Sequence, residues 1–129
     1  MNTKEAWNRW DEGRWGWLGE SMTPIDYGVL HMKFPAAAIK NARDYGYAKR
    51  DEAQNDAPTT EEFVTFAEAA GLDRVTFETY VVSPHREDRR ITVEGILIKD
   101  ATPAERNWIY RNNPDELDEF GGFIRAWWD

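Results

Sequence analysis

Residues 75–98 read VTFETYVVSPHREDRRITVEGILI, and this stretch decides the fold that the sequence predicts. Apolar and polar side chains alternate in the runs VTFETYV and ITVEGIL, and a period of two residues is typical of strands that bury one face. The charged connector SPHREDRR joins the two runs. We therefore expect an antiparallel hairpin, with strands at residues 74–83 and 89–99 and a long charged tip.

The residues before this hairpin predict a further strand and a helix. The run IDYGVLHMKF at residues 25–34 alternates, so that His31 lies on one side of the strand while Met32 and Phe34 lie on the other. Pro35 suits the first turn of a helix, because a backbone N–H has no partner there in any case. Apolar spacing continues this helix to about residue 48.

Two capping-box patterns predict where later helices begin. Thr59 and Glu62 have the spacing in which each side chain binds the backbone N–H of the other residue. The apolar helix face that follows ends at Gly71, where a left-handed C-terminal cap is expected. Thr102 and Glu105 repeat the pattern, with a proline at the first helical position between them.

The C-terminal residues leave alternatives open. The sequence NPDE at residues 113–116 predicts another helix, which ends near the Gly-Gly pair at 121–122. The final FIRAWWD is apolar and predicts either a short strand or a tail docked on the core. We expect a single α+β domain over residues 1–129. Its small antiparallel sheet combines the hairpin 74–83/89–99 with strand 25–34, with or without a C-terminal strand, and three to five helices pack on one face.

The composition supports one folded domain and excludes several chemistries. Of the 129 residues, 41% are hydrophobic and 14% aromatic, whereas disordered chains are poor in aromatic residues. The absence of cysteine excludes disulfides, thiolate nucleophiles and Cys-based zinc sites. No apolar run reaches the roughly 18 residues of a membrane span, and the charged start lacks the apolar segment of a signal peptide. We expect a cytoplasmic protein without membrane association.

The net charge indicates the kind of partner. Lysine and arginine total 16 and the acidic residues 24, which leaves a formal charge of −8. This charge repels nucleic-acid phosphates and suits a basic protein partner, because complementary potentials speed association. The alternative is that the acidity only keeps a small protein soluble and monomeric. Tryptophan serves as an interface anchor as well as a core residue, and clustered tryptophans leave a homo-oligomer open as an alternative. The predicted partner-binding residues are Asp115, Glu116, Asp118, Glu119, Trp15 and Trp17.

The tip of the hairpin is a basic island in an acidic chain. Its arginines, Arg86, Arg89 and Arg90, are candidates for anion binding, since guanidinium groups bind carboxylate or phosphate with a fork of two hydrogen bonds. The alternative is that they pair with the neighbouring Glu87 and Asp88 in a solvated tip.

Catalytic chemistry has less support in the sequence. His31 and His85 belong to no zinc or nucleophile motif, and neither a calcium loop nor a glycine-rich phosphate loop occurs. Glu78 and Glu94 interrupt apolar strands, so that pairing of the hairpin places both on its solvent side. On that side the two glutamates are either a carboxylate pair that acts as acid and base or ordinary surface residues. We assign no catalytic residue, no metal and no cofactor.

Three functions remain open at this point. The first is a non-enzymatic acidic module of the inhibitor, immunity or anti-defence type, which covers a basic surface of a partner protein. The second is a small-ligand or carbohydrate-binding domain that uses the N-terminal tryptophans as a stacking platform. The third is a small enzyme that uses a carboxylate pair, or His31 with an arginine, in a concave pocket. Charge and composition favour the first.

Overall fold

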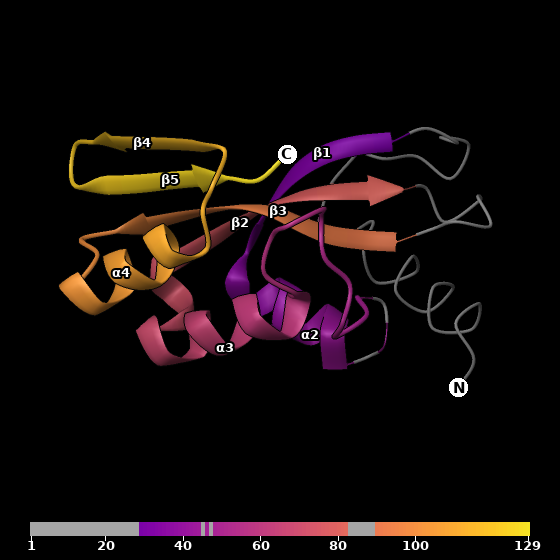
Figure 1. Cartoon of the computed structure of the whole chain (residues 1–129). Coiled ribbons are helices and arrows are strands. Elements are labelled where there is room, and N and C mark those ends of the chain that lie inside the picture. Colours follow the sequence, from indigo (N-terminus) through magenta and orange to yellow (C-terminus); the bar gives the residue numbers. More distant parts are fainter. Residues whose placement is uncertain (1–28, 45, 47, 83–89) are drawn as a thin grey trace.

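The computed structural model describes residues 29–44, 46, 48–82 and 90–129 (Figure 1). The strands are β1 (Val29–Pro35), β2 (Val75–Val82), β3 (Arg90–Lys99), β4 (Glu116–Phe120) and β5 (Phe123–Trp127). The helices are α2 (Ala36–Asp44), α3 (Thr60–Ala70) and α4 (Pro103–Arg111), with a 3₁₀ turn at Leu72–Arg74. None of these described helices is long and apolar enough to cross a bilayer.

The strands form one antiparallel sheet in the order β1-β2-β3-β5-β4. The helices α2, α3 and α4 lie on the same side of this sheet, which leaves the other side without a described helix (Figure 1). We call the first side the helix-covered face and the second the open face. The predicted α+β class, the central hairpin and the C-terminal strand are confirmed.

The core fills the space between the helices and the helix-covered face. Phe77 at the centre of β2 and Phe63 of α3 are fully buried, and their rings meet edge to face with centroids 5.5 Å apart. Trp128, directly after β5, packs edge to face on the Phe63 ring, with the ring centroids 5.4 Å apart. Its indole N–H donates to the Asn112 carbonyl at 2.8 Å. Burial of such a side chain contributes up to about 3 kcal/mol. The C-terminal end therefore both pairs as a strand and docks on the core.

Both predicted capping boxes are present. The Thr59 hydroxyl accepts from the Glu62 N–H at 3.2 Å, and the Glu62 carboxylate accepts from the Thr59 N–H at 3.1 Å. Thr102 and Glu105 exchange the same pair of bonds at the start of α4. Gly71 has the expected positive φ of 106°, but its ψ of 115° is not that of a left-handed cap. Its N–H still donates to the Ala67 carbonyl, which closes the last turn of α3.

The prediction that Pro35 takes the first helical position is wrong, because Pro35 is the last residue of β1 and α2 begins at Ala36. The helix is also shorter than expected. Its last helical residue is Asp44, and Gly46 follows with a φ of 83°. The Gly46 N–H donates back to the Arg43 carbonyl, and the Ala48 N–H donates to the Ala42 carbonyl. A glycine in this conformation satisfies the last carbonyls while it turns the chain away from the helix axis.

The helix predicted over residues 113–122 is wrong, because these residues form a hairpin instead. Strands β4 and β5 pair in register about Gly121 and Gly122, which have φ values of 53° and 83°. Two central residues with positive φ are what a tight two-residue hairpin turn requires. The Asp100 N–H also donates to the Gly122 carbonyl at 2.7 Å, which fixes the turn beside the end of β3. A Gly-Gly pair between two short segments that can pair as strands is a hairpin signal, and here it outweighs the capping pattern.

Candidate functional site

A β-bulge in the central hairpin shapes the open face. Glu78 pairs with Gly95 while Thr79 pairs with Val93, so that Glu94 is the extra residue of β3. A bulge of this kind lets two consecutive residues point to the same side. Glu94 and Gly95 therefore both belong to the open face, between the buried Val93 and Ile96 of the opposite face. As the sequence predicts, Glu78 and Glu94 share one face, but Glu94 is buried there and so is not an ordinary surface residue.

Glu94 is hydrogen-bonded to His31 and does not form a carboxylate pair with Glu78. Its Oε1 lies 2.5 Å from His31 Nδ1, a contact between residues 63 apart in the chain. The Glu94 side chain is only 4% exposed, whereas that of His31 is 65% exposed. Tyr80 supports the other side of the imidazole, edge to face at 5.5 Å. A carboxylate that holds Nδ1 fixes the orientation of the ring and leaves Nε2 for another partner.

Glu78 forms a two-pronged ion pair with Arg125 of β5. Arg125 Nε donates to Glu78 Oε1 at 2.8 Å, and its Nη2 donates to Oε2 at 2.9 Å. The hydrogen bond to Glu78 raises the pKa of Arg125 above its ordinary value, although burial acts against this. A Cβ atom at Gly95 would lie 3.0 Å from Glu78 Oε2 and 3.1 Å from the Ala126 carbonyl. Glycine at the bulge thus gives the Glu78 carboxylate the room it occupies.

These groups line a pocket on the open face with a volume of about 450 Å³. Its chemistry is that of a binding site with fixed donors and acceptors, since both carboxylates already have partners within the fold. No group of three or more His, Asp or Glu side chains that could hold a metal occurs in the described part of the chain. The lining residues are His31, Met32, Lys33, Glu78, Glu94, Arg125 and Trp127.

The four predicted acidic residues lie in and beside the edge strand β4, but not on one face. Arg125 Nη1 lies 3.4 Å from Glu116 and 3.7 Å from Asp118, which places these two on the open face. Glu119 points to the opposite side, where it binds Arg106 and the Tyr110 hydroxyl of α4. The hydrogen bond from that hydroxyl, with the nearby guanidinium, holds the pKa of Glu119 below its usual range.

The structure also describes two other predicted site residues, Asp115 and Arg90. The Asp115 carboxylate accepts from the Asp129 N–H at 2.7 Å, so that it ties the chain end to β4. Arg90 lies at the start of β3, with its guanidinium 5.4 Å from the centre of the Tyr80 ring and 3.6 Å from Glu52. The remaining predicted site residues lie outside the described part of the chain: Trp15, Trp17, Arg86 and Arg89.

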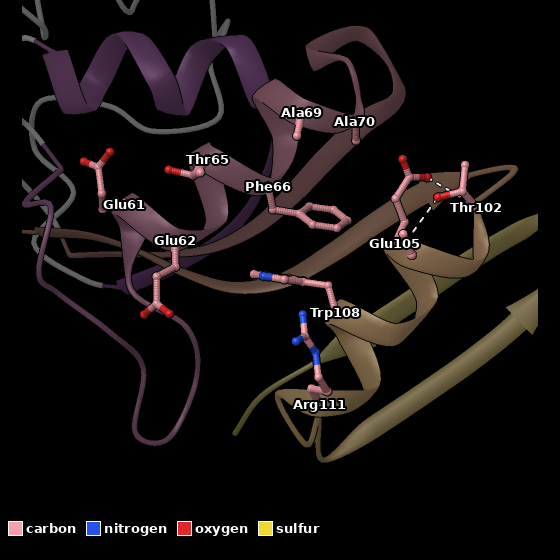
Figure 2. A pocket seen from close by; sticks show the side chains of 11 residues that line it. Glu61, Glu62, Thr65, Phe66, Ala69, Ala70, Thr102, Glu105, Trp108 and Arg111 are labelled. Atoms are coloured by element: carbon pink, nitrogen blue, oxygen red, sulfur yellow. Dashed lines mark hydrogen bonds between the residues drawn. The ribbon is translucent and has the colours of Figure 1, made fainter.

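A second concavity, which the sequence did not indicate, lies between α3 and α4. Figure 2 shows Phe66 of α3 and Trp108 of α4 at its centre, with Glu62 and Arg111 toward one end. The two rings stack with centroids 4.2 Å apart and an interplanar angle of 23°. The cavity holds about 600 Å³. Each helix was predicted, but the pairing of their aromatic residues depends on how the helices pack.

Comparison with protein families, with curated proteins and with solved structures gives no match for this chain. Its function is therefore inferred from the geometry of its own residues.

Proposed function

We propose that the protein is a non-enzymatic acidic binding module of the inhibitor, immunity or anti-defence type, which covers a basic surface of a partner protein with the edge of its sheet at β4. The observation that carries this proposal is the character of β4. It is an edge strand, all five of its residues are exposed, and it reads ELDEF. An edge strand offers backbone donors and acceptors to an extended segment of another protein.

The side chains of β4 supply both contact area and charge. Leu117 and Phe120 are 40% and 55% exposed, so that both offer apolar surface to a partner. The Glu116 and Asp118 side chains are 58% and 63% exposed, and their distances to Arg125 are longer than those of its bonds to Glu78. Both carboxylates are therefore open to a cationic partner. Such a combination of apolar contacts with charge suits an interface.

The same charges disfavour a second copy of this chain as the occupant. Two β4 edges that paired with each other would bring like charges opposite one another, which destabilises cross-strand pairs. Residues 115–129 carry five acidic groups and one arginine, so the whole hairpin region has a charge of −4. Acidic groups on an edge strand thus block self-pairing and select for a basic partner.

The test compares two variants with the same change in net charge. The first carries Asp115→Asn, Glu116→Gln, Asp118→Asn and Glu119→Gln, and the second carries Asp51→Asn, Asp56→Asn, Glu68→Gln and Asp73→Asn, which are exposed acids away from β4. Each serves as bait for affinity capture from the source cell at low and at high salt. A captured basic protein is then purified, and its association rate is measured. We expect the β4 variant to associate on the order of tenfold more slowly and to lose its salt dependence.

Equal association rates for the two variants would contradict the proposal, because general acidity would then explain the binding. The exposed apolar residue gives a second readout. Phe120→Ser leaves the charge unchanged, and we expect it to raise the dissociation rate by about tenfold. A dissociation rate equal to that of the unchanged protein would remove β4 from the interface.

A second candidate function, small-ligand binding, is favoured by the cleft between α3 and α4. The stacked Phe66 and Trp108 rings form an apolar floor for a flat ligand such as a sugar or nucleobase ring. Here the candidate platform is Trp108 rather than the N-terminal tryptophans. In a screen of sugars and nucleosides by NMR, a ligand of this cleft should shift the indole N–H signal of Trp108, and Trp108→Leu should abolish its binding. Binding that survives this substitution would place the ligand elsewhere.

A further inference from the structure

The open-face pocket contains one cation that the fold does not use. Its two carboxylates are each held by a partner, Glu94 by His31 and Glu78 by Arg125. Lys33, two residues after His31 on the same face of β1, lines the pocket beside its cross-strand neighbour Glu78. Its backbone pairs within the sheet, but its ammonium group makes no ion pair or hydrogen bond with any described residue. The charges of Glu78 and Arg125 are used in their mutual ion pair, and Glu94 is occupied by His31. Lys33 is therefore the lining residue whose positive charge is available to a ligand.

We propose that this pocket binds a small organic anion that carries a flat ring, of the class of the aromatic carboxylates. The Lys33 ammonium binds the carboxylate of the ligand, and its ring rests against the indole of Trp127, which lines the same pocket. A volume of about 450 Å³ lies within the range of small-molecule sites. This inference is independent of the proposed partner at β4.

His31 supplies the second contact to the anion. Its Nδ1 is turned toward Glu94, and Tyr80 packs against the ring, so that Nε2 is the nitrogen left for a ligand. In its protonated form the ring donates from both nitrogens, to Glu94 on one side and to the ligand carboxylate on the other. In the neutral form with the proton on Nδ1, Nε2 is an acceptor and does not bind a carboxylate. Because Glu94 is buried and fixed by the bulge, the direction of this donor is set before the ligand arrives.

The shape of the pocket depends on Gly95. A methyl group there would meet the Glu78 carboxylate at 3.0 Å and the Ala126 carbonyl at 3.1 Å, and the sheet backbone cannot give way as a flexible side chain can. Gly95→Ala therefore displaces Glu78 from its bond with Arg125 and changes the floor of the pocket. Lys33 stays in place, which separates the contribution of shape from that of charge.

The test is a titration of the full chain with benzoate, followed by the NMR signals of the histidine rings and of the backbone amides. The chain has only two histidines, so a His31→Gln variant identifies the ring signals of His31. We expect saturable shifts at the His31 ring and the Gly95 amide, with a Kd in the millimolar range that suits a ligand of this size. Lys33→Gln should weaken benzoate binding by about tenfold, since it removes a charged hydrogen bond.

The controls separate this site from general attraction. Lys49→Gln makes the same change of charge at an exposed residue outside the pocket and should leave the affinity unchanged. Acetate, which lacks the ring, and benzamide, which lacks the charge, should both bind more weakly than benzoate. Equal binding of benzamide and benzoate would overturn the assignment of an anion. Equal effects of Lys33→Gln and Lys49→Gln, or shifts centred on Trp108, would overturn the assignment of the pocket.

Discussion

The two faces of the sheet are made by the same strands but are held together by different forces. On the helix-covered face, large apolar side chains such as Phe77 pack against α3. They stabilise the fold through the total apolar area that they remove from water. On the open face, individual charged groups meet specific partners, as Glu78 meets Arg125. The first arrangement tolerates exchanges of similar volume, while the second fails when either partner is removed. The helix-covered face therefore stabilises the fold, and the open face holds the paired charged groups that line the pocket.

The largest expected loss of stability comes from replacing one of two adjacent tryptophans that lie on opposite faces of the sheet. Trp128 is 1% exposed on the helix-covered side, while Trp127 is only partly buried on the open side. Trp128→Ala should lower the free energy of unfolding by about 3–5 kcal/mol, because it leaves a cavity beside Phe63 and removes the bond to the Asn112 carbonyl. Trp127→Ala should cost about 1 kcal/mol. Denaturant unfolding of both variants measures the difference, and equal losses would end the distinction between the faces.

A smaller effect is expected from the ion pair on the open face. Glu78→Gln should cost about 1–3 kcal/mol, because it leaves the partly buried Arg125 guanidinium without its charged partner. Arg125→Met should cost a similar amount. The double variant should cost less than the sum of the two, since neither the Glu78 carboxylate nor the Arg125 guanidinium is then left without the other. A double-mutant cycle by urea unfolding measures this coupling, and strict additivity would show that the pair acts only through packing.

The pH dependence of stability distinguishes a carboxylate held by partners from one that is merely buried. Burial raises the pKa of Glu105, but hydrogen bonds from Arg74 and Thr102 outweigh it and hold the pKa below the ordinary range. A depressed pKa gives stability that is present above the unfolded pKa, about 4.3, and lost as pH falls through the folded pKa. Glu105→Gln should therefore lose about 1 kcal/mol at neutral pH and show a flatter loss of stability in acid.

The pKa of Glu52 is shifted in the opposite direction to that of Glu105. Burial is the largest influence on its pKa and raises it, despite the nearby Lys49 and Arg90. The folded state then binds a proton more tightly than the unfolded state does, so this group favours folding more as pH falls through its folded pKa. Glu52→Gln removes that gain and should steepen the loss of stability in acid. Urea unfolding between about pH 3 and pH 7 measures how stability depends on pH in both variants and in the unchanged protein. If both substitutions changed that slope in the same direction, the stated causes would be contradicted.

The smallest effect concerns Thr92, at the second position of the central strand's run ITVEGIL. It is 1% exposed, and its Oγ1 is a buried side-chain atom with no hydrogen-bond partner in the described structure. A buried hydroxyl without a partner costs stability, while valine has nearly the same shape. Thr92→Val should raise the free energy of unfolding by about 0.5–1 kcal/mol, measured by its denaturation midpoint. A destabilised variant would show that the hydroxyl has a partner in solution.

The sequence predicted the local elements better than the contacts between them. Alternation over residues 75–98 predicted the hairpin and the face of Glu78 and Glu94, and the Thr59 and Thr102 patterns predicted two helix starts. The capping pattern at Asn113 predicted a helix where a hairpin occurs, because the turn at the Gly-Gly pair and pairing with β3 outweigh local helix signals. The stacking of Phe66 on Trp108 had no signal in the sequence, since it depends on how two helices approach each other.

What the sequence determined by itself is the set of signals that act over a few residues: the period of each strand, the helix caps, the acidic charge and the absence of cysteine. What only the tertiary structure decided is which charged group meets which. His31 and Glu94 are 63 residues apart, and Glu78 and Arg125 are 47 apart. Their meeting depends on strand order, on register and on the bulge in which Glu94 is the extra residue. A shift of one residue in that register would turn each side chain to the other face, so no local pattern can specify these pairs.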